Sequence, residues 1–88
     1  MIQKNKTYTI LDAEAKTKSF IKQKHGEVER IYIAMMFPEG NAWTLQGEIE
    51  FKRLHLFSTL KAFEAQVSKN TGEVTSFLES HIMNPKKQ

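Results

Sequence analysis

The chain has 88 residues, of which 40% are hydrophobic and 26% charged, with a formal net charge of +3 and no cysteine. A chain of this length buries about 60 to 65% of the surface that it exposes when unfolded, so we expect one modest core. The missing cysteines exclude a disulfide scaffold, a thiolate metal site and a cysteine nucleophile, and no apolar run is long enough for a signal peptide or a membrane span. We predict a single domain over residues 1–88, located in the cytoplasm, with 1–8 and 82–88 as frayed tails.

The first predicted element is a helix over about residues 12–25. Asp12 is a residue type that caps helices, and no Pro or Gly interrupts the segment that follows. The "HG" pair at 25 and 26 combines a cation for the last turn with a Gly for a left-handed stop. Phe20 and Ile21 are the large anchors of a narrow apolar stripe that needs a sheet to cover it. The stripe is extended by Leu11, Ala13, Ala15 and Thr17.

The rest of the chain has the alternation and turn residues of β-strands. "EVERIYIAMMF" predicts a strand near residues 28–37, and "PEGN" predicts a turn into a second strand near 42–53. "AFEAQVSK", at 62–69, predicts a third strand that turns at "NTGE" into "VTSFL". The fold class is therefore α+β, with one N-terminal helix packed on a three- to four-stranded antiparallel β-meander. "RLHLFSTL", at 53–60, fits a bulge, a strand extension or a short packed turn equally well.

The strand predicted near residues 28–37 is apolar on both faces. Alternation gives one face formed by Ile31, Ile33, Met35 and Phe37. The opposite face is also largely apolar and is formed by Tyr32, Ala34 and Met36. One helix covers only one face of a sheet, so this second face needs another cover. Either the tail or residues 53–60 fold over it, or these three residues form an interface with a second subunit or a protein partner.

The second strand, "AWTLQGEIEFKR", separates buried from solvated residues. Its alternation places Trp43, Leu45, Ile49 and Phe51 inside. On the other face, Glu48 and Glu50 lie about 7 Å apart, with Glu64 expected on the neighbouring strand. Paired carboxylates serve as general acid and base in some enzymes, but a flat sheet offers no cleft that would perturb their pKa values. We predict solvated or cross-strand paired carboxylates and no enzymatic activity.

No other residue pattern indicates a cofactor or a metal. His25, His55 and His81 are far apart in the chain, with neither an i, i+4 pair nor a cysteine partner. Each of the four glycines lacks the second Gly and the following Lys of a phosphate-binding loop. We therefore predict no metal site and no cofactor.

The positive charge is concentrated in the N-terminal part of the chain. Up to His25 there are six lysines and two acidic residues, which gives +4, whereas the remainder has a net charge of −1. The candidate anion-binding residues on the predicted helix are Lys16, Lys18, Lys22 and Lys24, which could contact nucleic-acid phosphates with salt-dependent affinity. Only two arginines exist and no aromatic residue is interleaved on the lysine face of the predicted helix, so base readout lacks support. A solvated helix face is the commoner meaning of such a run.

Two stretches carry a resemblance to known families. "W-T-L-Q-G-E-I-E-F-K-R" and "F-E-A-Q-V-S-K-N-T-G-E-V-T-S-F" resemble the PepSY-type domain and the gas vesicle accessory protein of the O type. The PepSY-like pattern is a strand that ends in "V-x-x-x-T-G-E-V", matched by Val67 through Val74. The gas-vesicle-like pattern is matched by Trp43, Glu48, Glu50 and Arg53, and then by Phe63 and Glu64.

The resemblance covers residues 13–77 and concerns the fold more than the function. The proline-bearing loop and the basic, tyrosine-rich tail of the gas vesicle family are missing from this chain. Neither family is enzymatic in itself, so the resemblance implies a binding or assembly module. We predict a non-catalytic protein-association or assembly module that forms a homodimer or binds a protein partner. Nucleic-acid binding through the lysine-rich helix is the alternative.

Overall fold

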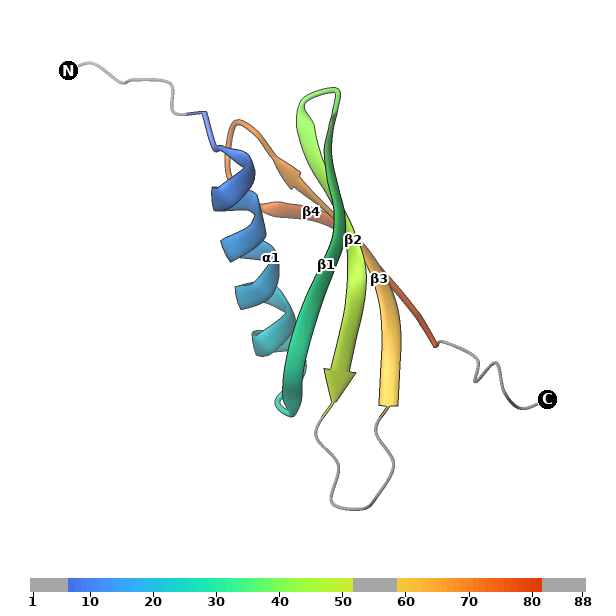
Figure 1. Ribbon diagram of the computed structural model, residues 1–88. Coiled ribbons are helices and arrows are strands. Elements are labelled where there is room, and N and C mark those ends of the chain that lie inside the picture. The colour runs from blue at the N-terminus through green and yellow to red at the C-terminus, as the bar shows by residue number, and fades with distance from the viewer. Residues whose placement is uncertain (1–6, 52–58, 82–88) are drawn as a thin grey trace.

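The computed structural model describes residues 7–51 and 59–81. A helix, α1 (Ile10–Lys24), precedes four strands, β1 (Val28–Glu39), β2 (Ala42–Phe51), β3 (Thr59–Ser68) and β4 (Val74–His81). The strands form one antiparallel sheet in the order β1-β2-β3-β4, and α1 lies along one face of it (Figure 1). The predicted α+β fold is confirmed, with four strands in the meander.

The two ends of α1 differ from their predicted form. Thr9, not Asp12, is the N-cap: its hydroxyl accepts from the Asp12 N–H (3.2 Å), and the Asp12 carboxylate accepts from the Thr9 N–H (2.9 Å). This reciprocal capping box starts the helix two residues earlier than predicted. At the other end, His25 has extended backbone (φ −119°), and positive φ occurs in the described residues at Gly40 and Gly72. Gly26 therefore does not provide the predicted left-handed stop.

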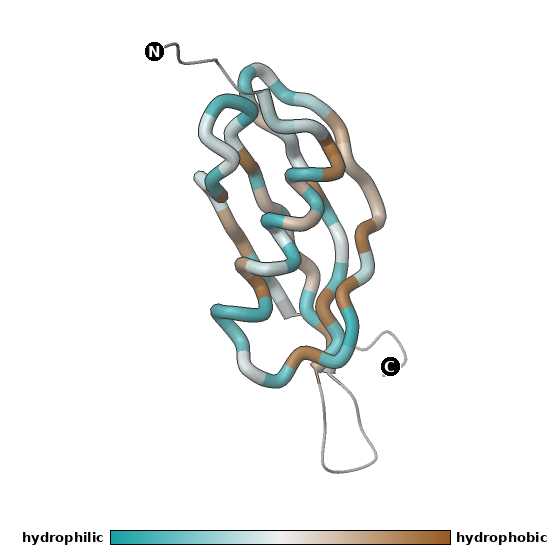
Figure 2. The backbone as a smooth tube through the Cα atoms, turned by 90° about the vertical axis from the view of Figure 1, so that its left-hand side faces the viewer, coloured by the Kyte–Doolittle hydropathy of each residue, from teal (hydrophilic) through white to brown (hydrophobic). Residues whose placement is uncertain are grey.

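The core lies between α1 and the sheet. Ala13, Thr17 and Ile21 recur every four residues on one side of α1 and are fully buried. They meet the buried side chains of β2 and β3, namely Leu45, Ile49, Phe63, Ala65 and Val67. Hydrophilic residues dominate the outer side of α1 that faces the viewer in Figure 2, as expected of a helix that buries one narrow stripe. Leu11, which we expected in that stripe, is 69% exposed.

Strand β1 carries a bulge that the sequence pattern did not indicate. Ile33 pairs with Gly47 while Met35 pairs with Gln46, so Ala34 is an extra residue. The extra residue reverses the orientation of the side chains that follow it. Met36 therefore packs against the core, and Met35 is 54% exposed on the other face. The prediction that Met36 shares a face with Tyr32 and Ala34, and Met35 with Ile31, is wrong for this reason.

The N-terminal segment is attached to the turns at one end of the sheet. The Tyr8 N–H donates to the Lys69 carbonyl oxygen, and Nε1 of Trp43 donates to the Tyr8 carbonyl oxygen, both at 2.8 Å. The Lys69 N–H donates to the Asn41 carbonyl oxygen, which joins the β1–β2 and β3–β4 turns. Tyr8 thus belongs to the folded domain rather than to a frayed segment.

Three predicted segments lie partly or wholly outside the described residues. Residues 59 and 60 of the ambiguous segment 53–60 begin β3. Residues 1–6, 53–58 and 82–88 lie outside the described residues, and with them the predicted fraying of both tails.

Candidate functional site

The sheet face opposite α1, here called the open face, is left uncovered by the other described elements. Two rows of paired residues cross its middle. They are Tyr32–Glu48–Ala62–Ser80 and Met35–Gln46–Glu64–Leu78, each running from β1 to β4. Opposite residues in an antiparallel pair point to the same side, so both rows lie on the open face.

Among the described residues, three large apolar or aromatic side chains are exposed on this face. Tyr32 is 45% exposed, Met35 54% and Leu78 64%. Tyr32 and Met35 lie on β1 and Leu78 on β4, so they flank the polar centre of the sheet from both edges. Ala34, in the bulge of β1, is exposed beside them. Of the three residues predicted as an interface, Tyr32 and Ala34 are therefore exposed here, whereas Met36 is replaced by Met35.

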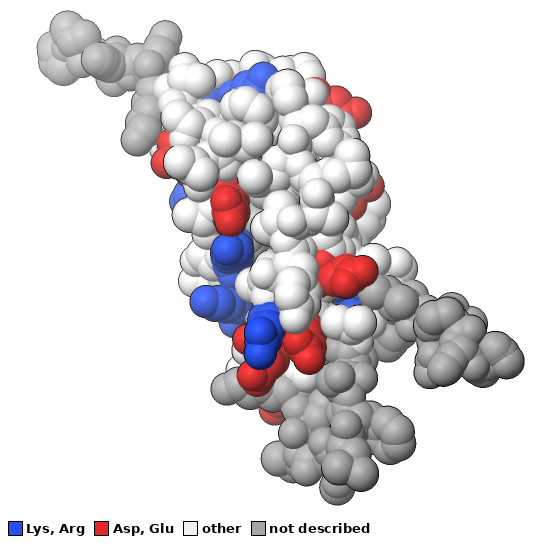
Figure 3. Space-filling model, viewed as in Figure 1, with Lys and Arg blue, Asp and Glu red and all other residues white. Residues whose placement is uncertain are grey.

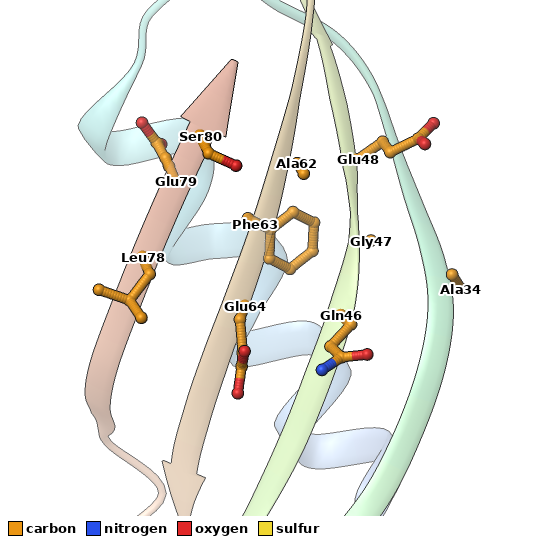
Figure 4. A pocket seen from close by; sticks show the side chains of 10 residues that line it. All are labelled: Ala34, Gln46, Gly47, Glu48, Ala62, Phe63, Glu64, Leu78, Glu79 and Ser80. Atoms are coloured by element: carbon orange, nitrogen blue, oxygen red, sulfur yellow. The ribbon is translucent and has the colours of Figure 1, made fainter. Parts of the chain in front are cut away.

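A depression of about 520 Å³ lies on this face, lined by residues that include Ala34 of β1 and Leu78 of β4. Figure 4 shows Gln46 and Glu64 side by side on neighbouring strands, with Leu78 on the far side of Glu64. Ala34 and Ala62 have short side chains, and the depression forms because they leave space between longer neighbours. The site is a broad open surface rather than an enclosed pocket.

The carboxylates of the open face are partly engaged with β1. The Tyr32 hydroxyl donates to Oε1 of Glu50 (3.1 Å), and Nε of Arg30 lies 3.8 Å from the same oxygen. The hydrogen bond to Glu50, then burial and the nearby negative charges, raises the pKa of the Tyr32 phenol, against the opposing effect of Arg30. Glu48 and Glu64 form no ion pair within the described residues. Glu48 and Glu64 line the open depression rather than an enclosed cleft.

Glu39 adds a further carboxylate to this face and makes a small polar network that the sequence did not predict. Its Oε1 accepts from Oγ1 of Thr44 (2.6 Å) and from Nε2 of Gln66 (3.1 Å). Thr44, which lies on the open face by the alternation of β2, is fully buried because this network covers it. No local sequence signal links Glu39 to Gln66, since they are 27 residues apart and meet only through the strand register.

A second polar cluster lies on the α1 side of the sheet, at the C-terminal end of the helix. Nε2 of His25 and Oε2 of Glu79 lie 2.5 Å apart, and Nζ of Lys61 lies 3.5 Å from the other Glu79 oxygen. The His25 ring also stands edge-on to Phe51, with centroids 4.9 Å apart. Burial raises the pKa of Glu79, but the hydrogen bond with His25 and the positive charges of His25, Lys61 and Lys24 outweigh it and lower the pKa.

This cluster has the character of a structural ion pair. It contains one imidazole and one carboxylate, and the described residues include no group of three or more metal-ligating side chains. Its members come from a helix end and two strands, so the cluster ties α1 to β3 and β4.

The helix lysines do not lie on one side of α1. Lys18 and Lys22 are four residues apart and share a side, and Lys18 makes an ion pair with Glu14 (3.0 Å). Lys16 lies instead on the side that faces the β3–β4 turn, near Gly72 and Glu73. Lys24 is in the last turn, beside the His25 cluster. Figure 3 shows basic side chains gathered over part of α1, with acidic residues directly beside them.

Comparisons of the chain with models of protein families, with curated proteins and with solved structures found no match. The resemblance to the PepSY-type and gas vesicle families stays a prediction. Within the described residues, no helix is both long and apolar enough to cross a membrane. The site is therefore defined by its own geometry: an uncovered sheet face with exposed apolar side chains around a carboxylate-bearing centre.

Proposed function

We propose that this protein is a non-catalytic association module that binds a protein partner on the open face. The observation that carries the proposal is the exposure of Tyr32, Met35 and Leu78 on the one sheet face that α1 does not cover. Large apolar side chains on a shared face contribute affinity when a partner removes them from water. Aromatic residues and Met are also enriched in protein interfaces.

The charge of the open face specifies the kind of partner. Among the described residues it carries the carboxylates of Glu39, Glu48, Glu50 and Glu64, against the single guanidinium of Arg30. A complementary surface is therefore cationic around an apolar centre. Electrostatic complementarity of this kind selects orientation and speeds association, while the apolar side chains supply most of the affinity.

The same geometry argues against a catalytic role for the carboxylates. General acid and base catalysis needs a carboxyl group whose pKa is shifted by burial or by a second charge. Glu48 is exposed to solvent. The Glu50 carboxylate forms an ion pair with Arg30 and accepts a hydrogen bond from the Tyr32 hydroxyl. These carboxylates are suited to attracting a cationic partner.

The proposal is tested by titrating the isotope-labelled protein with two synthetic helical peptides. One carries Leu on one face and Lys on the other, and its match carries Glu in place of Lys. We expect the Lys peptide to shift the NMR signals of Tyr32, Met35 and Leu78, and the Glu peptide to bind more weakly. Met35→Glu should weaken binding of the Lys peptide about tenfold, the equivalent of about 1.4 kcal/mol.

Leu11→Glu is the matched control, because Leu11 is also an exposed large apolar residue but lies on α1, away from the open face. It should leave peptide binding unchanged. If neither peptide shifts the open face, or if Leu11→Glu and Met35→Glu weaken binding equally, the proposal is wrong. A duplex oligonucleotide is added in a separate titration. Salt-dependent binding at Lys18 and Lys22, without peptide binding, would favour nucleic-acid recognition instead.

A further inference from the structure

The two edges of the sheet are not equally protected against pairing with another strand. β1 has bulges at Glu29 and Ala34, charged residues at 29 and 30, and Pro38 near its end. Bulges, charges and proline are the devices by which natural sheets prevent edge-to-edge pairing. β1 is therefore a poor template for a further strand.

Strand β4 lacks most of these devices. Its one irregularity lies at its start, where Thr75 is the extra residue between two consecutive pairs with β3. From Ser76 onward the ladder is regular, and the segment contains neither proline nor lysine. Its charged residue, Glu79, points to the α1 side and is paired with His25 and Lys61. From Ser76 to Ser80, the outward edge of β4 thus presents a regular row of backbone groups with no charged side chain left unpaired beside it.

We infer that β4 pairs with β4 of a second copy of this chain, so that two four-stranded sheets join into one sheet of eight strands. An antiparallel pairing of identical strands is generated by a two-fold axis, which makes the same surface serve both partners. Backbone hydrogen bonds hold such an added strand, and the side chains that alternate along it determine the register. The inference adds a second surface and does not depend on which partner binds the open face.

The side chains of β4 select one register. An axis at Glu79 would place two glutamates directly opposite each other, which is unfavourable. An axis at Phe77 would bring the bulged Thr75 into the new ladder. An axis at Leu78 avoids both in a ladder of residues 76–80: Leu78 meets Leu78 of the second copy, Phe77 meets Glu79, and Ser76 meets Ser80. The most exposed apolar residue of the strand then lies at the centre of the interface.

Cysteine crosslinking tests this register, because the natural chain has no cysteine. Directly opposite residues of antiparallel strands have Cα atoms about 4.5 to 5.5 Å apart, within the range that a disulfide spans. With oxidised glutathione, Leu78→Cys should form a covalent dimer. Ser76→Cys and Ser80→Cys should each stay monomeric on a non-reducing gel, whereas an equilibrated mixture of these two variants should crosslink. Glu29→Cys, on the other edge of the sheet, is the matched control.

Sedimentation of the unmodified protein completes the test and should show a dimer that persists at high salt. A monomer at every concentration would overturn the inference. So would a dimer in which Leu78→Cys crosslinks no faster than Glu29→Cys, since it would show that another surface holds the two copies. Neither result would affect peptide binding by the open face, so the two proposals fail separately.

Discussion

Gly47 is the position at which the backbone arrangement depends most directly on one residue type. The bulge at Ala34 brings β1 so close to β2 that a Cβ at Gly47 would lie 1.9 Å from the Tyr32 carbonyl oxygen. It would also lie 3.0 Å from the Tyr32 carbonyl carbon and 3.1 Å from the Ile33 Cα. All three atoms belong to the backbone, so no side-chain rotation relieves the contact. Gly47→Ala therefore requires the two strands to separate by about 1 Å, far more than the few tenths that a packed sheet absorbs.

Overpacking of a well-packed interior typically costs about 1 to 3 kcal/mol, and we expect Gly47→Ala to cost about 3 kcal/mol because backbone must move. A domain of this size has about 4 to 13 kcal/mol of stability in total, so the loss is large. Urea unfolding followed by Trp43 fluorescence measures it. Gly26→Ala is the matched control, since nothing lies within 4 Å of a Cβ there and its φ is not positive. If the free energy of unfolding of Gly47→Ala is within about 0.5 kcal/mol of that of the natural protein, β1 and β2 are not as close at Gly47 as the structure shows.

Four further predictions concern side chains. Ile21→Ala should cost about 2 to 4 kcal/mol by leaving a cavity in the core, and a loss below about 0.5 kcal/mol would show that this face of α1 is not buried. Thr17→Val should stabilise the protein by about 1 kcal/mol in the same unfolding assay, because the buried Thr17 hydroxyl has no hydrogen-bond partner among the described residues. Glu48→Gln combined with Glu50→Gln should change stability by less than about 1 kcal/mol, whereas titration of either carboxyl near neutral pH by NMR would indicate a desolvated site. Because the pKa of Glu79 is lower in the folded state, its ionised carboxylate stabilises the fold at pH values above its pKa in the unfolded chain, and this stabilisation is lost as the pH falls. The difference in stability between the natural protein and Glu79→Gln should therefore shrink below about pH 4. A difference that does not change with pH would contradict the ion pair.

The sequence predicts β2 and β3 better than β1, for a physical reason. β2 and β3 pair without a register shift, so strict alternation holds along both. Trp43, Leu45, Ile49 and Phe51 accordingly lie on the α1 side, as predicted. In β1, the extra residue Ala34 reverses the face on which every later side chain lies. Nothing in the sequence "YIAMMF" indicates this bulge. The available signal was on the other strand, where a glycine inside an otherwise regular strand indicates close backbone approach.

Two groups of side-chain contacts between segments far apart in the sequence were not predicted. The His25–Glu79 pair joins residues 54 positions apart, and it follows from where α1 ends over the sheet. The Glu39 network likewise depends on the register of three strands. By contrast, the capping box at Thr9 was readable, because Thr followed three residues later by an acidic residue is a local pattern. Local features such as helix caps can thus be predicted from this sequence. The candidate site cannot, because its residues are brought together by the register of the strands.

The two proposed surfaces are connected through Leu78, which belongs to both the open face and the edge of β4. In the proposed dimer, the row Met35–Gln46–Glu64–Leu78 continues across the two-fold axis into the same row of the second copy, in reverse order. Two exposed methionines then mark the ends of a row that crosses eight strands, with a carboxylate on each side of the central leucine pair. A partner with two matching segments would bind both halves, and linking two sites increases apparent affinity without any new contact. Disrupting the edge with Leu78→Asp should therefore weaken binding of a tandem Lys peptide more than binding of the single Lys peptide, as measured by calorimetry. Met35→Glu should weaken both, and equal losses for the two peptides on Leu78→Asp would show that the dimer does not join the two open faces.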